Sequence, residues 1–259
     1  MIYLTIIGLS GRMGTAIGTL APEYGFTLLG GVGFGTTGLP VPLLSPAQAL
    51  APGSALAATA AIIDFSGPEG FETALKLAGQ LRVPLVSGST GLTRDHFASL
   101  ADLARSVAVL HGSNMSLGVN LLLNVLPTIT QALGPDYDVE IVDIHHNRKK
   151  DAPSGTAIAL EAAVRDHTFR AQDVTIHGRS GQVGERPHNE IGIHALRAGD
   201  IVGDHTVYFC GPGERVEVTH RAHSRDTFAR GALRAAQYLR TRAPGLYTMR
   251  DVLGLSGPH

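Results

Sequence analysis

Short apolar runs in the first half of the chain alternate with segments in which apolar residues recur at helical spacing. The runs cover residues 2–7, 26–32, 60–65, 83–86 and 107–110. They contain almost no polar alternation, which is typical of strands buried on both faces of a parallel sheet. The segments at helical spacing include residues 71–81 and 93–105. This repeated order of strand, turn and helix predicts an α/β fold.

The second half of the chain has a different pattern. Helices are expected over 116–133, from Ser154 onward and over 226–240. Strands with alternating polarity are expected at 138–144, 191–197, 205–210 and 215–222, and glycines mark several turns. We therefore predict an α+β domain with a mixed, largely antiparallel sheet.

The overall charge and composition exclude several classes of function. The 259 residues carry a formal net charge of -1, so no global field attracts nucleic acid or an anionic membrane. A single cysteine, Cys210, excludes an intramolecular disulfide, and no Cys/His spacing resembles a zinc site. No apolar run approaches the roughly 20 residues of a membrane helix. We expect a cytoplasmic protein without a metal.

The first predicted strand is followed by a glycine-rich turn. Gly8, Gly11 and Gly14 stand between this strand and a helix, an arrangement that brings backbone amides close to a pyrophosphate in Rossmann-like domains. A tight structural turn explains the glycines equally well. Residues 33–38, which follow the second strand, lack the acidic residue that usually binds the adenosine ribose. The preference between NADH and NADPH therefore stays open, and Arg12 either faces a 2′-phosphate or lies in solvent.

The strongest concentration of chemistry lies at residues 145–157. His145 and His146 titrate near neutrality, and Lys149 and Lys150 add positive charge. Ser154 is expected to cap a helix whose first amides suit a carboxylate or phosphate. Basic runs are often solvated and single histidines are often structural, but the combination favours acid chemistry on an anionic substrate.

This stretch closely resembles the His-His-x-x-Lys-x-Asp-Ala-Pro-Ser-Gly-Thr-Ala signature of the 4-hydroxy-tetrahydrodipicolinate reductase (dihydrodipicolinate reductase) family. The resemblance covers essentially the whole chain, with support at 8–14, 64–70, 112–120 and 197–228. It implies NADH- or NADPH-dependent reduction of 4-hydroxy-2,3,4,5-tetrahydrodipicolinate, a small dicarboxylate, with loss of water. It also implies a dinucleotide-binding domain of residues 1–116 and 226–259, a substrate-binding and oligomerisation domain of residues 117–225, and a homotetramer assembled through the second-domain sheet.

The resemblance assigns roles to individual residues. His145 is expected to be the proton donor and acceptor and Lys149 the second acid and charge partner, while His146, Gly155 and Thr156 contact the substrate. Together with the small-residue turns after the strands, it implies a cofactor site made of Gly8, Leu9, Ser10, Gly11, Arg12, Met13, Phe34, Gly88, Ser89, Thr90, Gly112, Ser113, Asn114 and Met115. Two alternatives remain, another two-domain dehydrogenase of a small anionic acid and a non-catalytic dinucleotide sensor.

Overall fold

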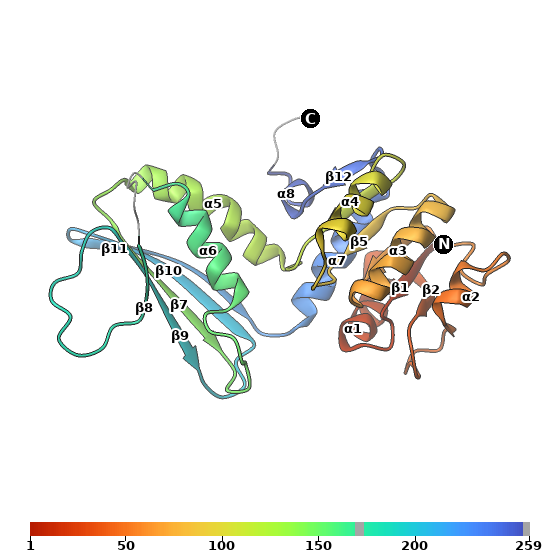
Figure 1. The fold of residues 1–259 in the computed structure, drawn as a ribbon, viewed down its shortest axis with the longest axis horizontal. Helices are drawn as coiled ribbons and strands as arrows, with labels where there is room; N and C mark the ends of the chain where they lie inside the picture. The colour runs from red at the N-terminus through yellow and green to blue at the C-terminus, as the bar shows by residue number, and fades with distance from the viewer. Residues whose placement is uncertain (169–173, 256–259) are drawn as a thin grey trace. The chain divides into compact units, whose positions relative to one another are not determined.

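The computed structural model describes residues 1–168 and 174–255 and consists of two compact units (Figure 1). Unit 1 combines Met1–Leu117 with Asp226–His259, and unit 2 is the continuous segment Gly118–Arg225. Unit 2 is thus inserted into unit 1 between a strand and a helix.

Unit 1 is built on a parallel sheet. Within the described residues the strand order is β12 (Gly245–Tyr247), β6 (Ala108–His111), β5 (Leu85–Ser87), β4 (Ala61–Asp64), β1 (Ile2–Ile7), β2 (Phe26–Val32) and β3 (Leu43–Leu44). From β3 to β6 this is the strand order of the Rossmann fold, so the predicted Rossmann-like domain is confirmed. Strand β12 was not predicted from the sequence, because its three residues are too few to show a periodicity.

Helices cover both faces of this sheet, which explains why its strands are apolar throughout. On one face lie α1 (Arg12–Leu20), α7 (Asp226–Leu239) and α8 (Met249–Val252), together with a 3₁₀ turn at Ala21–Tyr24. On the other face lie α2 (Pro46–Leu50), α3 (Pro68–Leu81) and α4 (Arg94–Leu103). Consecutive β1 residues therefore enter different cores: Ile6 packs on the α1 side and Ile7 on the α3 side. Helix α3 begins three residues before the predicted start at Phe71, because Pro68 suits the first helical turn.

Unit 2 contains a second, mixed sheet. It comprises, in spatial order, β11 (Glu214–Ala222), β10 (Gly203–Gly211), β7 (Asp138–His145), β9 (Glu190–Arg197) and β8 (Val174–His177). The prediction of a mixed sheet is confirmed, but the prediction that it is largely antiparallel is wrong. Among the described strands, β10 pairs antiparallel with β11 and β7, whereas β9 pairs parallel with β7 and β8. A long connection containing α6 (Gly155–Arg165) returns the chain to the same edge and permits this parallel pairing. Strand β8 was not predicted from the sequence.

The core of unit 2 lies on one face of its sheet. Helices α5 (Leu117–Leu133) and α6 contribute Leu126 and Leu160, which pack with Ile141 and Phe209 of the strands. Burial alternates along β7, so Val139, Ile141, Asp143 and His145 are buried and the residues between them are half-buried. Two of the residues on this inward face are polar, and they belong to the candidate site.

None of the helices in the described part of the chain combines the length and apolar character needed to cross a lipid bilayer.

Candidate active site

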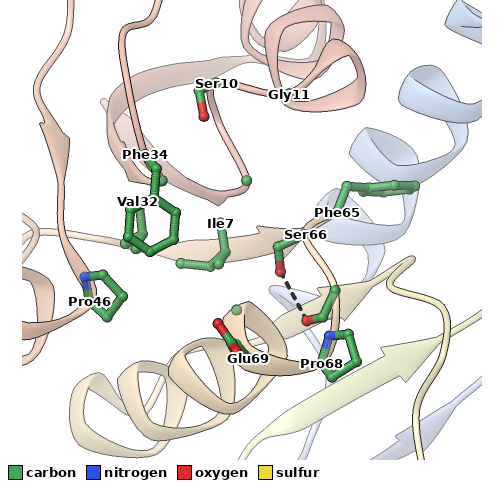
Figure 2. Close-up of a pocket in the computed structure, with 14 residues that line it drawn as sticks. Ile7, Ser10, Gly11, Val32, Phe34, Pro46, Phe65, Ser66, Pro68 and Glu69 are labelled. Atoms are coloured by element: carbon green, nitrogen blue, oxygen red, sulfur yellow. Dashed lines mark hydrogen bonds between the residues drawn. The ribbon is translucent and has the colours of Figure 1, made fainter.

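Unit 1 has a cavity at the carboxyl edge of its sheet, between the ends of β1 and β4. This is the point where the strand order reverses, which is where open α/β sheets bind ligands. The cavity has a volume of about 540 Å³ (Figure 2). Its lining residues are Ile7, Gly8, Ser10, Gly11, Val32, Gly33, Phe34, Pro46, Phe65, Ser66, Gly67, Pro68, Glu69 and Gly70.

The glycine turn beside this cavity tolerates no side chains at two positions. Gly8 has a φ of +84°, and a Cβ there would lie 2.6 Å from the carbonyl oxygen of Phe65. A Cβ on Gly14 would lie 2.2 Å from the carbonyl oxygen of Gly8. Helix α1 begins directly after Gly11, and no side chain caps its first turn. The tight turn and the helix start suit the pyrophosphate of a dinucleotide, so the residues present fit this cofactor.

The structure distributes the predicted cofactor residues unevenly. Gly8, Ser10, Gly11 and Phe34 line the cavity, and Phe34 is 76% exposed at its edge. Leu9 and Met115 are buried in the hydrophobic core, so only their backbones remain available to a ligand. The cavity lining found among the described residues does not include Arg12, Met13, Gly88, Ser89, Thr90, Gly112, Ser113 or Asn114.

Ser89 has a positioning role in the turn that follows β4. Its Oγ accepts hydrogen bonds from the amides of Ser66 and Gly67, each at 3.0 Å. Asp64 supports the same turn, because its buried carboxylate accepts a hydrogen bond from the Ser66 amide and, at 2.8 Å, from Ser87 Oγ. Burial raises the pKa of Asp64 and outweighs the opposing effect of these hydrogen bonds. The sequence analysis placed residues 64–70 at the sheet edge but did not assign them to the cofactor site, although several of them line the cavity.

A second cluster lies in unit 2 around Asp143, a fully buried residue of β7. Its Oδ1 lies 2.7 Å from Nδ1 of His145 and 3.5 Å from Nε2 of His205. Its Oδ2 accepts hydrogen bonds from the Ser154 amide at 2.7 Å and from Nη2 of Arg197 at 3.2 Å. Burial alone would raise the pKa of Asp143, but hydrogen bonds from His145 and Ser154 and the nearby imidazoles hold it well below its usual value.

The start of α6 adjoins this carboxylate. Ser154 caps the helix, as predicted, with its Oγ accepting a hydrogen bond from the Ala157 amide at 3.2 Å. Gly155 is exposed and Thr156 is half-buried in the first turn. A Cβ on Gly155 would meet no atom within 4 Å, so this helix start is open to a ligand.

The predicted histidines and lysine surround the same region. His145 ends β7, and the rings of His145 and His205 meet edge to face with centroids 5.2 Å apart. Partial burial and the charges of Arg148 and Arg225 lower the pKa of His146. Lys149 forms an ion pair with Asp151, with Nζ 2.9 Å from Oδ1.

Three members of the cluster, Asp143, Arg197 and His205, were not predicted as site residues. Each comes from a different strand, and the register of the sheet brings them together. Arg197 is opposite His145 in the β7/β9 pair, and His205 is opposite Asp143 in the β7/β10 pair. Their position on the apolar face of each strand was the available signal, since Asp143 shares the parity of Val139 and Ile141.

Asp143, His145 and His205 also offer three potential metal-ligand atoms within 4.8 Å of one another. Arg197 places a guanidinium against Asp143, and Ser154 places an amide there. These two donors already form hydrogen bonds with Oδ2 of the Asp143 carboxylate, and the positive charge of Arg197 repels a cation. The donor set therefore does not fit a resident metal ion.

Comparisons with known proteins cover both units. A model of the N-terminal region of dihydrodipicolinate reductase matches residues 2–115, and a model of its C-terminal region matches residues 118–253. A 4-hydroxy-tetrahydrodipicolinate reductase of Desulfovibrio desulfuricans is 46% identical over 257 residues, which is 96% of this chain and 98% of the relative. A protein of the same name from Myxococcus xanthus is 44% identical and covers 98% of both chains.

Solved structures show the same fold. A dipicolinate-bound dihydrodipicolinate reductase from Paenisporosarcina sp. TG-14 superposes with a TM-score of 0.75 at 21% identity, over 97% of this chain and 98% of that one. A DAP dehydrogenase of C. glutamicum, in complex with DAP, gives a TM-score of 0.55 at 13% identity over 96% and 92% of the two chains.

Proposed function

Because the chain belongs to the dihydrodipicolinate reductase family, we propose that it reduces 4-hydroxy-2,3,4,5-tetrahydrodipicolinate to 2,3,4,5-tetrahydrodipicolinate through the side chains clustered at residues 143–156. The family expected from residues 145–157 is confirmed, and with it the reductase function in lysine and diaminopimelate biosynthesis and the nicotinamide cofactor. Overall, one hydride and one proton are added to the substrate and one water is lost.

One observation carries the assignment of the site. The carboxylate of Asp143 contacts His145 through one oxygen and the Ser154 amide through the other. A titratable imidazole and an open helix start are therefore held at a fixed separation. A dianionic substrate needs cations and amides for its carboxylates and a proton source for its ring, and this cluster offers all three.

The proposed roles follow from these positions. His145 donates the proton, and Lys149 supplies a second acid and positive charge beside it. His146 contacts the substrate, while Gly155 and Thr156 hold a carboxylate through the first amides of α6. When bound, NADH or NADPH supplies the hydride.

The cofactor is proposed to bind unit 1, with the pyrophosphate at the turn of Gly8, Ser10 and Gly11. Phe34 is proposed to cover the adenosine end, since it is exposed at the cavity edge just beyond β2. The cavity lining among the described residues contains one charged side chain, Glu69, which belongs to the first turn of α3. Because no acidic residue follows β2 at residues 33–38, we propose that both NADH and NADPH are accepted.

The chain is further proposed to act in the cytoplasm as a homotetramer assembled through the sheet of unit 2. Support comes from the outward face of that sheet, where alternate residues of β7 and β10 are only half-buried and Leu196 of β9 is 46% exposed. Sedimentation velocity tests this assembly. A monomer at micromolar concentration contradicts it.

Oxidation of the reduced nicotinamide cofactor tests the function directly. The assay contains NADH or NADPH, and dihydrodipicolinate synthase generates the labile substrate in place. We expect oxidation that requires the synthase product and that falls by about 10²-fold or more in His145→Gln. His188→Gln is the matched control, because the His188 side chain is 85% exposed and has no proposed role in the reaction.

The same assay separates the two alternatives. Cofactor binding without oxidation of the synthase product indicates a dehydrogenase of another small anionic acid or a dinucleotide sensor. Screening other small 2-oxo and imino acids then distinguishes them, because only the dehydrogenase oxidises the cofactor with one of these substrates.

A further inference from the structure

Asp143 belongs to none of the substrate-contacting groups, yet it is the most connected side chain of the cluster. It is fully buried, and four groups surround its two oxygens: His145, His205, Arg197 and the Ser154 amide. A buried carboxylate is stable only when such donors satisfy it. The four donors stabilise the Asp143 carboxylate, and the carboxylate in turn holds the donors in their positions.

The chemistry of a carboxylate determines the state of the imidazole beside it. An ionised carboxylate only accepts hydrogen bonds, so its Oδ1, 2.7 Å from Nδ1 of His145, favours the tautomer that carries a hydrogen on Nδ1. In the neutral ring Nε2 is then the unprotonated nitrogen, and it is the atom that exchanges a proton with a ligand. Gly203 leaves room at this edge of the ring, because a Cβ there would lie 2.9 Å from Nε2.

The second oxygen of Asp143 fixes the distance to the helix start. It binds the Ser154 amide, one residue before the two amides proposed to hold the substrate carboxylate. Arg197 also holds the segment that precedes this helix start, because its Nη2 donates a hydrogen bond to the Asp151 carbonyl oxygen at 2.7 Å. One carboxylate therefore connects the proton donor and the anion-binding helix start.

We propose that Asp143 is a positioning residue for the reduction: it holds His145 in the Nδ1–H tautomer and sets the position of its Nε2 relative to the first turn of α6. The expected effect on kcat rests on the proposed function. The expected tautomer of His145 does not, because it depends only on the contact with Asp143. The titratable and charged groups around the pair are His146 and Lys149 from the following loop, Arg197 from β9, His205 from β10 and His220 from β11.

Nitrogen-15 NMR of histidine-labelled protein in alkaline solution tests the tautomer in the complete chain. The His145 signals are identified by their loss in His145→Gln. We expect the native chain to show Nδ1–H, and Asp143→Asn to lose this preference because an amide can donate to Nδ1. Asp64→Asn is the matched control, since Asp64 is equally buried but lies in unit 1. A native chain with Nε2–H, or an unchanged tautomer in Asp143→Asn, overturns the proposal.

The kinetic consequence is measured in the coupled assay, which follows oxidation of the nicotinamide cofactor. We expect Asp143→Asn to lower kcat by up to about 10⁴-fold, the loss seen when the carboxylate that orients a triad histidine is replaced by an amide, with an unchanged KM for the nicotinamide cofactor. Asp143→Glu restores the tautomer and part of kcat, which a purely structural role does not require. If the native chain does not oxidise the cofactor, the proposed function fails, while the tautomer measurement still decides the role of Asp143. If Asp143→Asn does not fold, the native tautomer and Asp143→Glu decide it.

Discussion

His205 on β10 places its Nε2 3.0 Å from Oγ of Ser154, the cap of α6, although 51 residues separate the two in the chain. The contact joins the sheet of unit 2 to the start of the helix proposed to bind the substrate. Burial lowers the pKa of His205 to about 4, against the attraction of Asp143. His205 is therefore neutral near pH 7 and unsuited to donate the catalytic proton there.

This lowered pKa predicts how stability depends on acidity. The unfolded chain binds a proton at position 205 near pH 6.5, whereas the folded chain binds it only near pH 4. The contribution of His205 is therefore fully present above pH 6.5 and is lost as the pH falls through that interval. We expect His205→Gln to show a shallower loss of stability between pH 6.5 and 4, as measured by urea unfolding at a series of pH values. Parallel pH profiles for the two proteins contradict the prediction.

The two adjacent lysines are expected to differ. Lys149 is largely buried and paired with Asp151, whereas Lys150 is exposed. We predict that Lys149→Ala lowers kcat by about 10²-fold or more, while Lys150→Ala changes it little. Steady-state kinetics with the synthase-generated substrate measure both. The reverse order of effects would transfer the proposed role to Lys150.

Phe34, two residues after the end of β2, is expected to control cofactor choice. Phe34→Asp places a carboxylate where dinucleotide sites bind the ribose hydroxyls, so it favours NADH and repels the 2′-phosphate of NADPH. We expect the ratio of kcat/KM for NADH to that for NADPH to rise about tenfold, which corresponds to about 1.4 kcal/mol. Phe34→Leu is the control for loss of the ring without added charge. An equal change in both variants excludes the electrostatic explanation.

The glycine turn is expected to be intolerant of a methyl group. Gly14→Ala places a Cβ 2.2 Å from the Gly8 carbonyl oxygen, so the turn must move. We predict that binding of NADH and NADPH weakens about tenfold or more, as measured by fluorescence titration. Gly79→Ala is a matched helical control, because the nearest atom to its Cβ is a side-chain carbon of Leu103 at an ordinary 3.5 Å. Equal binding by both variants contradicts a role of the turn in holding the cofactor.

Local chemistry explains which parts of the structure could be predicted. Strand β2 has the predicted bounds because its apolar run is continuous, and α6 begins at the predicted cap because Ser154 and the preceding proline act within a few residues. The family signature at residues 145–157 is also local, so it could be recognised without a fold.

The partners of Asp143 could not be predicted in the same way. Arg197 and His205 reach it only because β9 and β10 flank β7 in a particular register. The sequence shows each strand but not its neighbours, and the prediction of a largely antiparallel sheet did not include the parallel β7/β9 pair. A buried acid on an apolar strand face indicates that donors must come from elsewhere, without identifying them.

The insertion of unit 2 into unit 1 also determines the order in which the chain can fold during synthesis. Unit 2 is a single continuous segment and has all its strands once residue 225 has left the ribosome. The sheet of unit 1 can be completed only later, because α7, which covers one of its faces, and β12, which adds an edge strand, both follow unit 2 in the chain. The N-terminal strands are thus synthesised first but completed last, so a nascent chain exposes their apolar residues while the inserted unit folds.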